Sequence, residues 1–337
     1  MMSLPRLGNH GKKITLGLFF CIIILVIGVS SVMSNEKSLK NSYWLVFSVD
    51  NALADIRVNG VSVFKNSEAE EASESQPIAH LLTNGKNIVT FNFLAAIAKN
   101  NTLYINDYAK KDFFMAARID VSGENGSESI DIGYIDFNND KYESVEKSLK
   151  HVSFNPVGSN VQVKQIGQIE KSQFITYFGQ KFDSFKVDYE VNITNDNFRE
   201  LRWRNASSIN INDPDIKKKV INKYKDLRQF ISNNDGSSYV KEFYDGWDNT
   251  AYVYGLGSGD DFVKEVDARN PNKIGEGLQF NKFDYSEDEY TFEVTYDSKL
   301  VRLLPAPIAW EEYRISVQPV FYFDKDMNIH AASIVTD

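Results

Sequence analysis

The chain has 337 residues, with 37 basic and 46 acidic side chains and a net charge of −9. This acidity argues against a nucleic-acid partner and against docking on anionic lipid by charge, because both are held by clustered lysine and arginine. The single cysteine excludes an intramolecular disulfide, so the fold is stabilised without one.

The first 34 residues have the pattern of an export segment. Arg6, Lys12 and Lys13 precede an uncharged, largely apolar stretch at residues 14–34, which is long enough to span a membrane as a helix. The positive-inside rule predicts that the N-terminus stays inside a bacterial cytoplasmic membrane and that the main body lies in the periplasm. The stretch serves either as a single-pass anchor or as a signal peptide whose cleavage releases the protein to the periplasm, and both alternatives stay open.

The exported part is more acidic than the whole chain. Arg6, Lys12 and Lys13 are the only charged side chains in residues 1–34, so the remainder has 34 basic and 46 acidic side chains and a net charge of −12. Exposed acidity keeps a protein soluble, and it also attracts and orients a basic protein partner. Charge alone does not separate these two roles.

The exported length, about 300 residues, exceeds what one hydrophobic core usually covers, so we expect two domains, at residues 42–150 and 158–337. Short apolar segments separated by Asn, Gly, Asp and Ser predict a β-sandwich in the first domain. Residues 65–76 are rich in Ser and Glu and predict a mobile loop. The predicted strands are residues 43–49, 56–64, 88–93, 103–105, 113–121 and 130–137.

Turn residues give the first domain a resemblance to a known family. The pairs Asn59-Gly60 and Asn84-Gly85 can adopt the positive φ angles that tight turns require. The sequence resembles the galactose-binding-like jelly-roll that accompanies β-galactosidase-type enzymes, at residues 56–61, 78–82 and 84–89. The resemblance implies a β-sandwich and admits a glycan as ligand, but it transfers no binding residue to this chain.

The second half combines strands with helices. Residues 185–193 alternate apolar and polar side chains, as a half-buried strand does. Asp213 as N-cap and Pro214 at the first helical position begin a helix, and a shorter helix ends near Trp247. Strands are predicted at residues 290–296, 315–317 and 320–323.

This order of elements predicts an α+β domain with two helices on a curved antiparallel sheet. It is similar to NTF2-like and cystatin-like folds. The apolar stripe of the first helix consists of Ile216, Val220, Tyr224, Leu227 and Ile231.

Aromatic and acidic side chains are concentrated at the end of the second predicted helix. Tyr244, Asp245, Trp247 and Asp248 are our candidates for contact with a partner. Such a group binds sugars or the basic side chains of another protein. The alternative, to which we give more weight, is a helix end that packs its aromatic side chains into the core.

Motifs for metal binding and catalysis are poorly matched. Residues 136–140 copy the start of an EF-hand loop, but Lys141 and Lys147 stand where that loop requires Gly and Glu. Residues 324–328 carry a similar spacing of oxygen side chains and predict a hairpin turn. We therefore predict no metal site, no cofactor and no catalytic residue.

Three functional classes remain. The first is a non-catalytic envelope protein that binds a protein partner, for example an immunity protein that neutralises a basic toxin delivered to the periplasm. The second is a carbohydrate-binding module, and the third is a hydrolase with acidic residues in an unrecognised arrangement. Acidity, two predicted domains and the lack of catalytic motifs favour the first class.

Overall fold

The computed structural model describes residues 3–5, 39–66, 69–99, 102–105, 112–124, 126–138, 141–147, 149, 160–175, 181–194, 196–198, 200, 202–253, 258–282, 290–295, 298–311 and 315–336. The predicted export segment at residues 14–34 lies outside these ranges. Within them, no helix combines the length and the apolar character needed to cross a membrane.

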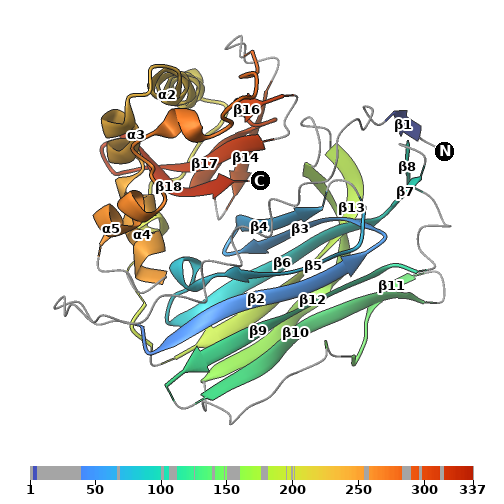
Figure 1. The fold of residues 1–337 in the computed structure, drawn as a ribbon. Coiled ribbons are helices and arrows are strands. Elements are labelled where there is room, and N and C mark those ends of the chain that lie inside the picture. The colour runs from blue at the N-terminus through green and yellow to red at the C-terminus, as the bar shows by residue number, and fades with distance from the viewer. Residues whose placement is uncertain are drawn as a thin grey trace.

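Within residues 41–193, the described strands form a β-sandwich of two five-stranded antiparallel sheets (Figure 1). One sheet has the order β11-β10-β9-β2-β5 and the other has the order β12-β13-β6-β3-β4. The strands are β2 Asn41–Asp50, β3 Ala52–Val58, β4 Val61–Asn66, β5 Ala72–Pro77, β6 Gly85–Ala95, β9 Phe114–Gly123, β10 Gly126–Asn138, β11 Lys141–Ser144, β12 Val161–Ile175 and β13 Lys181–Ile193. A small third sheet joins β1 Ser3–Pro5, β8 Thr102–Tyr104 and β7 Ile97–Lys99.

Alternating side chains place the core between the two large sheets. In β2, Tyr43, Leu45, Phe47 and Val49 are buried, and the residues between them face outward. The strand predicted at residues 43–49 is therefore confirmed. The β-rich character of the first half is confirmed with it.

The predicted Asn59-Gly60 turn joins β3 to β4. Both residues have positive φ, 50° for Asn59 and 80° for Gly60, as a two-residue hairpin requires. The Asn59 side chain donates to the carbonyl of Leu81 and to Asn87 Oδ1, and it accepts from the N–H of Ile88. The turn is thus bonded to the start of β6 as well as to its own hairpin.

Residues 65–76, predicted as a mobile loop, contain a strand. β5 pairs with β2 from Val49↔Ala72 to Trp44↔Pro77. It lies at the edge of its sheet, and its Ser and Glu side chains stay largely exposed. The loop prediction was wrong there because an edge strand can be held by backbone hydrogen bonds without burying its side chains.

The strand predicted at residues 185–193 belongs to the sandwich. β13 pairs with β6, with Val187 opposite Phe91, and β12 pairs with β13. The sandwich sheet therefore continues past the predicted division at residues 150–158 and ends at Ile193. Alternation predicts a half-buried strand, but it does not show which sheet the strand joins.

Residues 202–336 form a second unit of helices and an antiparallel sheet, which Figure 1 shows beside one end of the sandwich. The sheet order is β14-β15-β17-β16, and β18 also pairs with β17. The helices are α2 Pro214–Ser232, α3 Gly236–Glu242, α4 Tyr244–Val253 and α5 Gly259–Glu265, with 3-10 turns η4 Arg202–Asn205 and η5 Pro271–Lys273. The strands are β14 Thr291–Thr295, β15 Leu300–Leu304, β16 Ile308–Trp310, β17 Ile315–Phe323 and β18 Ile329–Thr336.

Helix α2 begins as predicted. The Asp213 side chain accepts a hydrogen bond from the N–H of Asp215 at 2.9 Å, and Pro214 occupies the first position. The whole predicted apolar stripe is buried. The Tyr224 hydroxyl donates to the carbonyl of Pro319 at 3.0 Å, which fixes the helix to the sheet. The second predicted helix is two helices, since α3 ends at Glu242 and α4 begins at Tyr244. The predicted end near Trp247 was wrong, because α4 continues to Val253.

Buried ion pairs join the sandwich to the second unit. Arg57 of β3 donates to Asp55 and to Glu293 of β14, and Arg302 of β15 donates to Glu293 at 2.5 Å. The four side chains are at most 13% exposed. Burial alone would raise the pKa of Glu293, but the charges of Arg302 and Arg57 outweigh it and hold that pKa well below its usual range. We call this group the junction pair cluster.

Candidate functional site

The four predicted contact residues lie in the first turn and a half of α4. This helix contacts β18 and the 3-10 turn η2 Ala79–Leu81 of the sandwich. Residues three apart on a helix share a face, so Asp245 and Asp248 lie on one side and Trp247 on another. The helix therefore separates the two acidic side chains from the indole.

Trp247 belongs to the core of the second unit. It is 8% exposed, and its ring packs against Tyr239, Phe243 and Phe262 at centroid distances of 6.2, 6.4 and 6.0 Å. Its indole N–H is buried and meets no hydrogen-bond acceptor among the described residues. This packing leaves Trp247 little surface for a partner and favours the structural alternative, while its role in partner contact stays a prediction.

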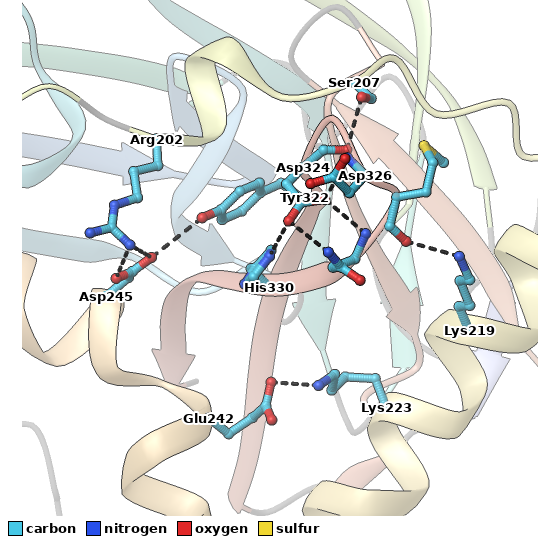
Figure 2. A network of polar contacts seen from close by, with 12 residues as sticks. Arg202, Ser207, Lys219, Lys223, Glu242, Asp245, Tyr322, Asp324, Asp326 and His330 are labelled. Atoms are coloured by element: carbon cyan, nitrogen blue, oxygen red, sulfur yellow. Dashed lines mark hydrogen bonds and ion pairs between the residues drawn. The ribbon is translucent and has the colours of Figure 1, made fainter.

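Asp245 accepts hydrogen bonds from two elements distant in sequence. Arg202 of η4 approaches it with one guanidinium nitrogen, 3.0 Å from Oδ1 and 3.2 Å from Oδ2, and the Tyr322 hydroxyl donates to Oδ2 at 3.3 Å (Figure 2). The Arg202 side chain is 75% exposed and that of Asp245 is 25% exposed. Burial and the neighbouring Asp245 charge raise the pKa of Tyr322 to about 12.

Asp248 has a partner within the helical layer. Its carboxylate accepts from the N–H of Gly259 at 3.1 Å, where α5 begins. A Cβ atom on Gly259 would lie 2.9 Å from the backbone nitrogen of Asp248, so the glycine permits the two helices to approach. Tyr244, the fourth predicted residue, is 46% exposed.

A hollow of about 230 Å³ opens beside α4, and the two predicted acidic residues, Asp245 and Asp248, line it. Its walls come from Glu200, which precedes η4, and from η4, α4, β17 and β18. They are Glu200, Arg202, Trp203, Asp245, Asp248, Asn249, Tyr322, Ala331 and Ala332. We call this the α4 hollow. Three carboxylates and one arginine give its lining a net charge of −2.

The α4 hollow is small and polar. Pockets for small-molecule ligands usually measure about 300–1,000 Å³, so this volume suits one long side chain better than a whole ligand. The two aromatic rings in its wall offer little open surface, because Trp203 is 2% exposed and Tyr322 is 5% exposed. The accessible polar groups are the acidic side chains, the amide of Asn249 and the guanidinium of Arg202.

Residues 324–328 form the predicted hairpin turn between β17 and β18. Asp324 accepts from the backbone N–H groups of Asp326 and Asn328 at 2.9 and 2.8 Å, from the Asn328 side chain at 3.1 Å, and from His330 Nε2 at 2.9 Å (Figure 2). These bonds, that from His330 first, hold the pKa of Asp324 well below its usual range. A carboxylate has about four lone-pair positions, so these donors occupy it and favour a turn over a cation site.

The other EF-hand-like stretch also has an internal partner. Asp136 Oδ2 accepts from Lys147 Nζ at 2.7 Å, so the lysine that replaces the usual Glu pairs with the first carboxylate. Asp140 lies outside the described residues. Across the described ranges, no three His, Cys, Asp or Glu side chains are grouped to hold a metal ion.

Sequence reasoning identified one wall of the α4 hollow and missed the others. Asp245 and Asp248 were predicted from local density of acids and aromatics, whereas Arg202 and Tyr322 approach from 43 and 77 residues away. No local pattern marks either residue. Only the packing of η4 and β17 against α4 brings them to the site.

No protein-family model, curated protein or solved structure matches this chain. The resemblance of its first half to a galactose-binding-like jelly-roll, and that of its second half to NTF2-like and cystatin-like folds, stay predictions.

Proposed function

We propose that this chain is a non-catalytic exported protein that binds a protein partner, and that the α4 hollow receives a basic side chain of that partner. The main support is the lining of the hollow, in which Glu200, Asp245 and Asp248 outnumber the single Arg202. Opposite charges in a partly enclosed site attract more strongly than on an open surface. Tyr244, next to Asp245 in sequence, adds an exposed aromatic ring to the same helix.

A glycan ligand has less support. Sugars are commonly held on the open face of an aromatic ring, but the rings in the wall of the α4 hollow, Trp203 and Tyr322, are almost fully buried. Trp247, the other candidate for stacking, lies in the core. An arginine or lysine side chain needs no stacking face, because carboxylates alone can accept its hydrogen bonds.

The partner class that we favour is a basic protein of the cell envelope. The net charge of −12 outside residues 1–34 complements such a partner over the whole surface. An immunity protein that neutralises a basic toxin in the periplasm fits this description. The proposal that this chain is exported rests on the pattern of Arg6, Lys12 and Lys13 before residues 14–34. A reporter enzyme that is active only in the periplasm, fused after Asp337, tests that topology.

Substitution of Asp245 tests the proposed contact. The full chain in an uncharged detergent serves as bait in an envelope extract, a captured protein is identified, and its purified form is titrated against variants. We expect Asp245→Asn and Glu200→Gln to weaken binding, and added salt to weaken the wild-type complex. Asp226→Asn, an equal charge change at an exposed position of α2, is the matched control. Equal binding by Asp245→Asn, Glu200→Gln and Asp226→Asn would place the contact elsewhere.

A further inference from the structure

Arg202 contacts Asp245, a carboxylate to which the proposed partner would bind. Its guanidinium lies against Asp245, a carboxylate of the α4 hollow that has no other ion-pair partner among the described residues, and Arg202 is itself part of the lining. We propose that Arg202 is an internal substitute for the partner's basic side chain: it covers Asp245 in the free protein and is displaced when the partner binds. This inference rests on the proposed function.

The geometry of the contact suits displacement. Arg202 uses a single nitrogen, Nη1, for both oxygens of Asp245. The strong arrangement of arginine and carboxylate uses two nitrogens in parallel, one for each oxygen. A guanidinium that enters the hollow with two nitrogens toward Asp245 would therefore form a better contact than Arg202 does.

The environments of the two side chains also favour displacement of Arg202. Arg202 is largely exposed and can leave into water without losing packing, and exposed ion pairs contribute little to stability. Asp245 is mostly covered, and the hydroxyl of the buried Tyr322 holds its Oδ2. The acceptor is thus held in place, while the cation that covers it is exposed and can be exchanged at little cost in free energy.

Charge around the hollow adds to this difference. A cation inside the hollow lies among the carboxylates of Glu200 and Asp248 as well as Asp245, whereas Arg202 forms part of the wall. Competition by Arg202 lowers the apparent affinity for any single cation. A partner must therefore offer a well-placed basic side chain, and the arrangement favours specificity over binding of every cation.

The test uses small probes with the full chain in an uncharged detergent. N-acetylarginine amide is titrated by NMR against wild-type protein and against Arg202→Ala and Arg202→Gln, with N-acetylcitrulline amide as the uncharged probe of the same shape. We expect both Arg202 variants to bind the arginine probe about two- to five-fold more tightly, the range that loss of an exposed ion pair produces. The citrulline probe should bind all proteins equally weakly.

A second exposed ion pair provides the matched control. Arg269 lies 3.6 Å from Asp260, is 59% exposed, and does not line the α4 hollow. Arg269→Ala changes the net charge as Arg202→Ala does, so an equal gain in affinity for Arg269→Ala would attribute the effect to overall charge and overturn the inference.

Asp245→Asn separates the inference from the function on which it rests. If Asp245→Asn loses the arginine probe while Arg202→Ala binds it as the wild type does, the binding site stands and the displacement by Arg202 is refuted. If Asp245→Asn binds the probe unchanged, the site of the proposed function fails, and the inference fails with it. Because both Arg202 variants alter an exposed side chain, we expect them to fold. Thermal unfolding curves of the variants check this.

Discussion

Arg57 and Arg202 each donate to a carboxylate that belongs to the second unit, but their surroundings differ. Arg57 lies in the junction pair cluster, where it and its partners Asp55, Glu293 and Arg302 are withdrawn from water. Arg202 lies at the α4 hollow and is mostly exposed. The same chemical pair is therefore fixed in one place and exchangeable in the other.

The difference shows that burial, more than pairing, decides what an arginine–carboxylate contact can do. A buried charge that loses its partner has no water to replace it, so each member of the junction pair cluster depends on the others. At the surface, water compensates for most of the loss. The first arrangement suits the attachment of two structural units, and the second suits a site where one cation replaces another.

The largest expected effect is the loss of Glu293. Glu293→Gln leaves Arg302 without its buried counter-ion and removes one of the two carboxylates that Arg57 contacts. We expect the free energy of unfolding to fall by about 3–5 kcal/mol, as when one member of a buried ion pair is removed. Urea denaturation followed by tryptophan fluorescence measures this loss.

The double variant Glu293→Gln/Arg302→Gln is the informative control. It removes the charge of Arg302 together with that of Glu293, and Arg57 keeps its contact with Asp55. We expect it to unfold less readily than the single variant, because fewer buried charges stay uncompensated. A loss below about 1 kcal/mol for Glu293→Gln would mean that water reaches the cluster and that the contrast with Arg202 is wrong.

Removal of the Trp247 ring should follow in size. Trp247→Ala deletes a buried ring from the core of the second unit, and such changes cost about 3–5 kcal/mol. We expect the lower part of that range, because the buried indole N–H has no acceptor among the described residues and its burial is unfavourable. Thermal unfolding of the variant checks the stability, and probe binding by the folded fraction checks the site.

Sequence reasoning succeeded where one segment determines its own structure. Asp213 and Pro214 begin α2, and the Asn59-Gly60 turn forms, because a cap and a tight turn need only neighbouring residues. It failed where the partner of a segment matters. Residues 72–77 form a strand through pairing with β2, which their composition does not indicate.

The candidate site follows the same rule. Asp245 and Asp248 could be predicted, since they stand in a segment that is dense in acidic and aromatic side chains. Trp247 could not be assigned, because its burial depends on α3 and α5, which pack around its ring. Arg202 and Tyr322 reach the α4 hollow only through tertiary packing, so the ion pair that carries our inference had no signal in the sequence.

Asp324 tests whether exposure alone decides the strength of a carboxylate contact. It is partly exposed, but several donors hold its charge, so its pKa in the folded protein lies below its ordinary value of 3.8. A depressed pKa means that the ionised form stabilises the folded state, so this contribution is complete above about pH 4 and is lost as the pH falls further. We expect the stability advantage of wild type over Asp324→Asn to close as the pH falls below about 4. Melting temperatures of both proteins across this range measure it, and a difference that persists in acid would contradict the assignment.

The smallest expected effect belongs to the Arg202–Asp245 pair. Because Arg202 is exposed and uses one nitrogen, a double-mutant cycle with Arg202→Ala and Asp245→Asn should give a coupling energy below about 1 kcal/mol. The coupling should fall further with added salt, since exposed charges are screened over about 8 Å at physiological ionic strength. Urea denaturation of the four proteins at low and high salt measures both quantities. A coupling of several kcal/mol that resists salt would make this pair equivalent to the junction pair cluster, and Arg202 would then be too firmly held for a partner's side chain to displace.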